Sequence, residues 1–490
     1  MMNDSDIRSL FLRAGKNLPA IDQVAAQLLR NRYPLKHALR AYKEFLAHAP
    51  RNANAAFNYA YYLSKDGQFD AAIEMYERAL ALGIEAPEEV HLNIANIYID
   101  HLKNGEKARQ HLRQSLAIQP GYASAWYNLG NLSEQDGNRA EAMHCFEQCL
   151  KYAPGNESAL ARLADAHRFD SKQDPLLLRL ADTARQSANS DVHFAVGRAY
   201  EQLEMFDLAW QHFARANELD EPGLPPYRQA AVEEVFNRIV SQCNAQWLSR
   251  FKGASDESVF ICGMFRTGST LLEQVFAAHP AFTAGGESEF FPRLVAKSLR
   301  RFPEGLDSIE PAAVQAWRGQ HRKHMRRLFD GSVRVTDKRP DNFLHIGLIK
   351  AVLPAAKFII TERDWRDVAT SVYSTRLGPG QNYATNLNNI RHYIDLQKRL
   401  IDHWQALLGA DLVRVNYEDL VQKPRDTVGG LLENLGEGWD ERCLSFNQLK
   451  NMVQTASVWQ VREPLHTRSV GRWSNYRRYF EAAFGAGLSA

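Results

Sequence analysis

Apolar positions in the first half of the chain recur with a helical period, in paired segments that short polar turns separate. The stretches 90–120 and 125–154 align with each other along their length, and the stretch 55–83 fits the same register. A weaker copy runs from 193 to 219. Each unit has the pattern helix, turn, helix, so this half of the chain is predicted to be an array of α-helical hairpins.

In the second half the pattern changes to short β-branched and aromatic runs that alternate with helical stretches. The predicted strands are 258–262, 333–336, 357–361 and 412–416, and the predicted helices are 268–278, 344–353, 366–375 and 384–408. Buried apolar strands that alternate with helices indicate a parallel α/β sheet. A proline-rich break at 220–226 separates the halves. We therefore predict an α plus α/β chain: an all-α solenoid over residues 1–225, a connecting helix within 226–255 and an α/β domain over 256–490.

The helical unit resembles the tetratricopeptide repeat, whose period of about 34 residues and small or aromatic positions it shares. The matching residues are Trp126, Leu129, Gly130, Ala142, Phe146 and Pro154. Gly67, Gly105 and Gly137 are expected in the tight turns. The resemblance implies a solenoid with a concave surface. Two roles stay open for it: docking of a peptide or protein partner or of the substrate, and an architectural role that includes formation of a homodimer.

The overall composition excludes several classes of protein. A formal net charge of +2 does not indicate a nucleic-acid partner, so any anion site must be local. The five cysteines are scattered and no cluster of His and Cys completes four ligands, so no metal is expected. No apolar run approaches ~18 residues, and the N-terminal stretch lacks the apolar core of a signal peptide. We expect a cytoplasmic protein without a membrane span.

The stretch VFICGMFRTGSTLL carries the clearest chemical signal. Gly263, Gly268 and Thr270 have the spacing of a phosphate-binding P-loop between a strand and a helix. The backbone N–H groups of such a loop, with the helix N-terminus, form an anion cradle. Ser269 occupies the position of the usual lysine, and the cation of the loop is Arg266. The loop should hold a phosphate in another manner than an ATP γ-phosphate site does. A P-loop nucleotide kinase or NTPase is the alternative interpretation.

Polar residues follow four of the predicted elements at the point where a strand ends. They are Arg266, Lys338, Arg363 and Tyr417. Ligands of parallel α/β sheets bind at the carboxyl ends of the strands. These four side chains are therefore expected to share one site.

The segment RTGSTLLEQVFAAHPAFTAGGE resembles the phosphosulfate loop of sulfotransferases. The arrangement is similar to that of protein-tyrosine sulfotransferases and of sulfotransferase domains joined to tetratricopeptide repeats, and the resemblance covers about residues 256–480. It implies a P-loop-type sulfotransferase domain. It also implies transfer of a sulfuryl group from 3′-phosphoadenosine 5′-phosphosulfate to an acceptor hydroxyl, without a metal. A peptide tyrosine, a glycan, a lipid and a small molecule all remain candidate acceptors. A repeat scaffold with a non-catalytic domain is the remaining alternative.

The resemblance implies two groups of site residues. Those that bind the donor nucleotide are Arg266 with the amides of Thr267, Gly268, Ser269 and Thr270 for the 5′-phosphosulfate, Arg363 and Ser371 for the 3′-phosphate, and Tyr417, Ser457 and Arg468 as further contacts. The catalytic residues are Glu287 as general base and Lys338, which stabilises charge on the bridging oxygen.

Three further residues are rivals of Glu287 for the role of base: Glu289, His279 and His345. Position 286 is glycine where the family tends to carry a glutamate, and Glu289 stands where an arginine is usual. The acceptor side is therefore expected to differ from that of the protein-tyrosine enzymes.

Overall fold

The protein, in a computed structural model, is described over residues 4–255, 257–299, 301–329, 334–449, 451–453, 455 and 457–486. Val333 of the predicted strand 333–336 and Asp256 at the predicted domain start lie outside the described residues. Internal contacts divide the chain into two compact units. The first is 1–133 with 140–156, and the second is 134–139 with 157–490.

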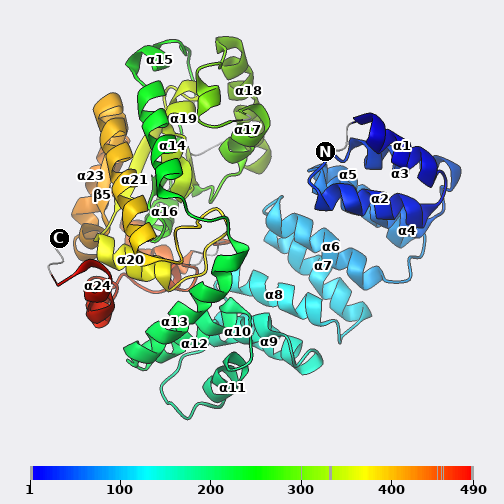
Figure 1. The fold of residues 1–490 in the computed structure, drawn as a ribbon, viewed down its shortest axis with the longest axis horizontal. Coiled ribbons are helices and arrows are strands. Elements are labelled where there is room, and N and C mark those ends of the chain that lie inside the picture. The colour runs from blue at the N-terminus through cyan, green and yellow to red at the C-terminus, as the bar shows by residue number, and fades with distance from the viewer. Residues whose placement is uncertain are drawn as a thin grey trace. The chain divides into compact units, whose positions relative to one another are not determined.

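The first unit consists of helices that pair with their sequence neighbours (Figure 1, blue to cyan). Its helices are α1 (Asp4–Ala14), α2 (Leu18–Arg30), α3 (Lys36–His48), α4 (Ala53–Lys65), α5 (Phe69–Ala81), α6 (Pro87–Asp100), α7 (Gly105–Ile118), α8 (Ala123–Gln135) and α9 (Arg139–Tyr152). The pairs α4–α5, α6–α7 and α8–α9 fall on the predicted repeats, which are thereby confirmed as helical hairpins.

Small residues allow the paired helices to approach closely. A Cβ atom on Gly130 of α8 would lie 2.6 Å from the ring of Phe146 on α9, too close for any side chain. Gly67 and Gly137 lie in the turns with φ of +83° and +78°, as expected. Gly105 does not: Asn104 caps α7 by accepting from the Lys107 N–H, so Gly105 is the first residue of that helix.

The second unit begins with two more helix pairs. They are α10 (Glu157–Ala166) with α11 (Pro175–Ala184), and α12 (Ser190–Gln202) with α13 (Phe206–Asp220). The pair α12–α13 confirms the weak repeat at 193–219, and we call it the last repeat. The predicted connecting helix is present as two pieces, α14 (Gln229–Gln242) and α15 (Ala245–Ser249). Asn244 separates them, because its side chain caps α15 by accepting from the Trp247 N–H.

A parallel sheet forms the centre of the α/β domain in the order β2-β3-β1-β4-β5. The strands are β1 (Val259–Gly263), β2 (Phe282–Ala284), β3 (Arg334–Lys338), β4 (Lys357–Glu362) and β5 (Leu412–Asn416). Four of them are the predicted strands within a residue or two, and β2 is a short edge strand that no pattern indicated. Since β3 and β4 flank β1 on opposite sides, the connections from β1 lead to opposite edges of the sheet, and the carboxyl end of β1 is a topological switch point.

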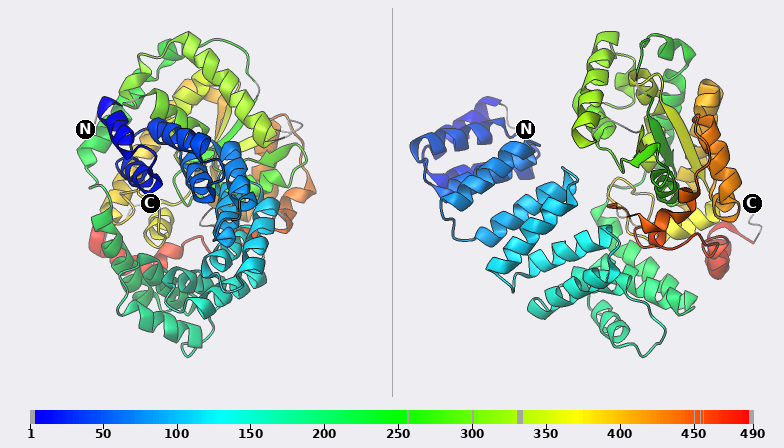
Figure 2. Two further views of the ribbon diagram at one scale, coloured as in Figure 1. Left: turned by 90° about the vertical axis from the view of Figure 1, so that its right-hand side faces the viewer. Right: turned by 180° about the vertical axis from the view of Figure 1, so that it is seen from behind.

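Helices cover both faces of this sheet (Figure 2). They are α16 (Ser269–Ala277), α17 (Phe290–Ser298), α18 (Pro311–Leu328), α19 (Ile346–Val352), α21 (Leu387–Leu408), α22 (Tyr417–Gln422) and α23 (Pro424–Asn434). Two further helices, α20 (Trp365–Tyr373) and α24 (Arg477–Phe484), pack in a separate hydrophobic cluster. Side chains alternate along β1: Phe260 packs with α14, α17 and α21, whereas Ile261 packs with α16 and α23. Two hydrophobic layers thus hold the strand ends in place.

Short 3₁₀ helices complete the unit. They are η1 (Glu221–Gly223), η2 (Glu304–Leu306), η3 (Pro340–Leu344), η4 (Gly409–Asp411), η5 (Glu441–Gln448), η6 (Gln460–Arg462) and η7 (Arg472–Tyr476). Within the described residues, no helix combines the length and the apolar character that crossing a bilayer requires.

The last repeat shares a hydrophobic core with the α/β domain. Trp210 of α13 stacks on Tyr373 and on Tyr479, with 4.7 Å between ring centroids in both pairs. Its indole also contacts Tyr476 of the C-terminal segment. The last repeat and the sheet therefore pack as parts of one compact unit, although the sequence boundary at residue 225 separates them and stays a prediction.

Candidate functional site

A cavity of about 260 Å³ opens at the carboxyl ends of β1 and β4, at the topological switch point. The loop after β1, the residues after β4 and β5, and the C-terminal segment all contribute to its wall. Of the predicted site residues, the lining includes Arg266, Gly268, Ser269, Thr270, Glu287, Arg363, Ser371, Tyr417 and Ser457. The structure thus brings together residues from five separate parts of the sequence.

The loop after β1 adopts left-handed backbone conformations at two positions. Arg266 has φ of +72° and Gly268 has φ of +92°, and α16 begins directly afterwards. A Cβ atom at Gly268 would lie 2.6 Å from the ring of Tyr417, so this position requires glycine. Successive N–H groups in such a loop converge on one point, and the first N–H groups of a helix have no partner within it. The loop is built as an anion cradle.

Thr267 belongs to this loop but does not line the cavity. Its hydroxyl is buried, donates to the carbonyl oxygen of Met264 at 2.7 Å and lies 2.7 Å from the hydroxyl of Thr361 on β4. These two hydrogen bonds tie the loop to the neighbouring strand, and they leave only the N–H of Thr267 for a ligand.

The Arg266 guanidinium contacts only neutral oxygens among the described residues. Its Nε donates to Ser371 Oγ at 2.9 Å, Nη1 to Ser457 Oγ at 2.5 Å and Nη2 to Gln460 Oε1 at 3.2 Å. Burial, followed by the charges of Arg472 and Arg363, lowers the pKa of Arg266 to about 10. A half-buried cation that faces other cations and no carboxylate favours an anionic ligand.

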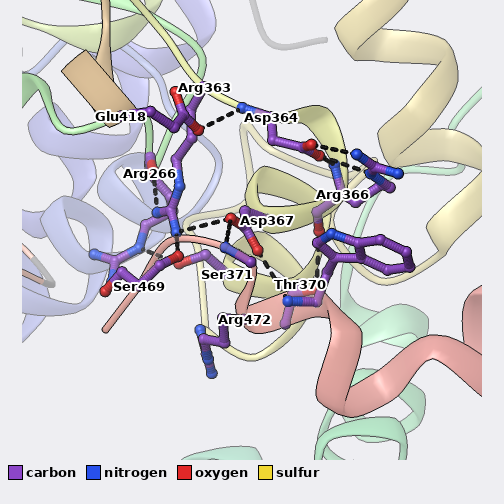
Figure 3. A network of polar contacts seen from close by, with 12 residues as sticks. Arg266, Arg363, Asp364, Arg366, Asp367, Thr370, Ser371, Glu418, Ser469 and Arg472 are labelled. Carbon is purple, nitrogen blue, oxygen red and sulfur yellow. Dashed lines mark hydrogen bonds and ion pairs between the residues drawn. The ribbon is translucent and has the colours of Figure 1, made fainter. Parts of the chain in front are cut away.

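Arg363 lies across the same cavity (Figure 3). Its Nη groups donate to the carbonyl oxygens of Arg266 and Ser469, and its guanidinium stacks 4.5 Å above the ring of Tyr417. The Nε–H group is buried and has no acceptor among the described residues. Asp367 lies 3.7 Å away, but its oxygens accept from the backbone N–H groups of Gly471 and Trp473 at 2.7 and 2.9 Å.

The two predicted catalytic residues contact each other. Lys338 Nζ lies 2.7 Å from Glu287 Oε1; the lysine side chain is 1% exposed and the glutamate side chain 36%. Lys338 ends β3, and its backbone N–H donates to the Gly286 carbonyl oxygen at 2.9 Å, which continues the pairing of β2 with β3. This pairing places the carboxylate of Glu287 at the cavity wall.

Glu273 of α16 was not singled out in the sequence. Its buried Oε1 accepts from the Gly286 N–H at 2.9 Å and from the Thr336 hydroxyl at 3.2 Å, so it supports the loop that carries Glu287. Burial raises the pKa of Glu273 to about 7, although Lys338 opposes the shift. The feature that could have identified Glu273 in the sequence is a charged residue on an otherwise apolar predicted helix, in the stretch STLLEQVF.

The three rival bases do not line the cavity. Glu289 pairs with Arg339 at 2.7 Å. His279 accepts from the Ala281 N–H and contacts the Gly438 carbonyl oxygen, which fixes the end of α16. His345 is half-buried, and the desolvation of its ring lowers its pKa to about 4.

The remaining predicted contact, Arg468, also lies outside the lining: its side chain is 69% exposed and pairs with Glu463. Its assignment stays a prediction. Among the described residues, no group of three or more His, Cys, Asp or Glu side chains is arranged to hold a metal ion.

Arg472 lines the cavity and was missed. No local pattern in the sequence indicates which residue pairs with it. That partner is Glu201 on α12, 271 residues earlier in the chain.

Comparison with known proteins finds similarity in both halves of the chain. Residues 258–441 match the family model described as sulfotransferase family, and residues 41–74, 60–123 and 123–156 match three tetratricopeptide-repeat models.

Two relatives and one solved structure are similar to the chain. An uncharacterized protein of Aquifex aeolicus (strain VF5) is 25% identical over 392 residues, which cover 76% of this chain and 51% of the relative. Protein-tyrosine sulfotransferase 1 of Danio rerio is 25% identical over 245 residues, or 44% of this chain and 65% of the relative. The chain thus spans less than two thirds of either relative. The sulfotransferase domain of the Synechococcus PCC 7002 olefin synthase is 21% identical, with a TM-score of 0.36 over 46% of this chain and 89% of that domain.

Proposed function

Because this chain carries a domain of the sulfotransferase family behind tetratricopeptide repeats, we propose that it transfers a sulfuryl group from 3′-phosphoadenosine 5′-phosphosulfate to an acceptor hydroxyl. The observation that carries the proposal is a single cavity. Its wall holds Arg266 and Arg363, whose guanidinium groups make no close pair with a carboxylate among the described residues, together with the carboxylate of Glu287. Phosphate and sulfate groups satisfy such arginines, and the carboxylate supplies a base.

The residues present fit the donor nucleotide. Arg266 and the N–H groups of residues 267–270 would hold the 5′-phosphosulfate, because the loop forms an anion cradle. Arg363 would hold the 3′-phosphate, since its buried Nε–H lacks an acceptor among the described residues. Ser371 accepts from Arg266 and so keeps its own O–H free to donate to the same phosphate.

The Lys338–Glu287 pair supplies the chemistry of transfer. A lysine has three N–H donors, and one of them serves Glu287. The others can stabilise negative charge on the bridging oxygen as its bond to sulfur breaks. Glu287 Oε2 can accept the proton of the acceptor hydroxyl as the new oxygen–sulfur bond forms.

Other parts of the proposal rest on the family and the repeats. We place the protein in the cytoplasm, in line with five unpaired buried cysteines, which are typical of reducing compartments. No metal is assigned to the reaction. The repeats serve docking of a protein partner or of the substrate, with homodimer formation as the alternative, and the acceptor is any molecule that presents a hydroxyl.

Calorimetry tests the donor assignment. Adenosine 3′,5′-bisphosphate should bind in the presence of a chelator, and more tightly than ATP with Mg²⁺. Radiolabelled donor should then transfer sulfate to acceptors in a cell extract. Tighter binding of ATP with Mg²⁺ would favour a nucleotide kinase or NTPase, and binding of neither nucleotide would indicate a non-catalytic scaffold.

A further inference from the structure

Two arginines of the cavity wall are held by carboxylates of the last repeat, α12–α13. Arg472 pairs with Glu201 of α12. Arg376 pairs with Asp191 of α12 at 2.9 Å and with Asp220 of α13 at 3.3 Å. Both arginines line the cavity. The last repeat therefore reaches the donor site through ion pairs as well as through the core around Trp210.

The Glu201–Arg472 pair is the more tightly defined of the two. Arg472 Nε and Nη2 donate to the two carboxylate oxygens of Glu201 at 2.6 and 2.7 Å, and Nη2 also donates to Ser374 Oγ at 3.1 Å. Tyr476 donates to Glu201 as well, at 2.9 Å. Such a two-point pairing fixes the plane of the guanidinium. The two N–H groups on Nη1 have no partner among the described residues, so they remain for a ligand.

Electrostatics explains why Arg472 needs this support. Arg266 and Arg363 lie near enough that their charges and that of Arg472 act on one another. Like charges in a low-dielectric cavity repel, and a long side chain escapes such repulsion by rotating into water. The side chains of Arg472 and Glu201 are only 21% and 19% exposed. A carboxylate behind Arg472 offsets the repulsion and keeps its free N–H groups at the cavity.

We infer that Glu201 is a positioning residue of the sulfotransferase site: it holds Arg472 against the bound nucleotide, so the last repeat is a working part of the donor site. The inference rests on the proposed function. It requires only that the nucleotide binds in this cavity, and it assigns no role to the other repeats.

A thermodynamic cycle tests the inference in the full chain, with adenosine 3′,5′-bisphosphate as the probe and its Kd from calorimetry as the readout. Glu201→Gln keeps the shape but removes the charge, and should weaken binding about tenfold, the effect of one lost charge-assisted contact. Arg472→Ala should weaken binding at least as much. In the Arg472→Ala background, Glu201→Gln should change the Kd by less than about twofold, because Glu201 acts through Arg472.

Asp207→Asn is the matched control. Asp207 also joins the last repeat to the C-terminal segment, through an ion pair of 2.5 Å with Arg478, but this pair is exposed and remote from the cavity lining. Its loss should change the Kd by less than about twofold. Wild-type affinity in Glu201→Gln would overturn the inference, as would a further tenfold loss in the Arg472→Ala background.

A charge-swapped variant covers the case in which Glu201→Gln does not fold. Glu201→Arg combined with Arg472→Glu restores an ion pair, so the melting temperature should recover, while a carboxylate now faces the nucleotide and should abolish binding. Wild-type affinity in this variant would also overturn the inference. Failure of the wild-type protein to bind the bisphosphate would instead refute the proposed function, so the two failures are distinguishable.

Discussion

Lys338 and Glu287 form an ion pair at the point where the reaction is proposed to occur. Lys338 is almost fully buried and Glu287 is partly exposed, so the pair presents its carboxylate to the cavity. A buried lysine that lost this partner would be left without compensation, at a considerable cost in stability. Glu287 therefore has a structural task in addition to its proposed catalytic one, and the two have to be separated by experiment.

Glu287→Gln should lower turnover by roughly 10²–10⁴-fold, the range for loss of a general base. Bisphosphate affinity should change little, because glutamine still accepts a hydrogen bond from Lys338. Glu289→Gln is the control, since Glu289 pairs with Arg339 and does not line the cavity. Steady-state rates with any accepted phenol provide the comparison. A larger loss in the Glu289 variant would assign the base to that residue.

Glu273 should make stability depend on pH. Burial raises its pKa from 4.5 to about 7, so between these values the folded state keeps a proton that the unfolded state has lost. The contribution of the protonated Glu273 carboxyl group to the free energy of unfolding is therefore fully present below about pH 4.5 and is lost as the pH rises towards 7. Glu273→Gln should remove this slope and raise stability at pH 8 relative to the wild type, by on the order of 1–3 kcal/mol. Denaturant unfolding at pH 5 and pH 8 measures the difference.

The control for this comparison is Glu433→Gln, at an exposed position on α23. It should leave the pH dependence unchanged. Equal slopes for wild type and Glu273→Gln would mean that Glu273 is not protonated in the folded protein at neutral pH.

Helix pairs of the repeats depend on small residues at their crossing points. Gly130→Ala should destabilise the first unit by about 1–3 kcal/mol, because the added Cβ would lie 2.6 Å from the ring of Phe146. Gly155→Ala, where no atom lies within 4 Å of the added Cβ, should have little effect. Thermal unfolding followed by circular dichroism compares the two variants. Equal melting temperatures would show that the helix pair adjusts without cost.

Some strands and site residues could be predicted from the sequence and others could not. The apolar runs that became β1, β3, β4 and β5 are distinct because both faces of the sheet are covered. The edge strand β2 has three residues, too few for a periodic signal. The glycine loop after β1 was predictable because its sequence pattern is local. Arg472 was not, since its role depends on a carboxylate in a distant helix, and no local pattern records such a pair.

Truncation tests how the chain divides into parts that fold alone. A fragment of residues 134–490 should fold and bind the bisphosphate as the full chain does, because it contains the whole second unit, 134–139 with 157–490. A fragment of residues 226–490 should aggregate or bind poorly. It lacks Glu201 and exposes Tyr373, Tyr476 and Tyr479, the aromatic partners of Trp210. Size-exclusion chromatography and calorimetry provide the two readouts.

Full affinity in the shorter fragment would instead support the sequence boundary at the proline-rich break, 220–226. The same result would contradict the positioning role of Glu201, since the fragment lacks that residue. The two fragments therefore test the predicted domains and the inferred donor site in one experiment.

The residues that form the cavity are synthesised in a fixed order during translation. A ribosome produces Glu201 first, the phosphate loop next, and Ser457 and Arg472 only after every strand of the sheet has been made. A nascent chain that stops after β5 has the cradle but lacks the last two of these contacts with the nucleotide. Affinity for the donor should therefore reach its full value only once translation has passed residue 472. Under the proposed function, a chain that ends before residue 472 should hold the donor nucleotide more weakly than the complete chain.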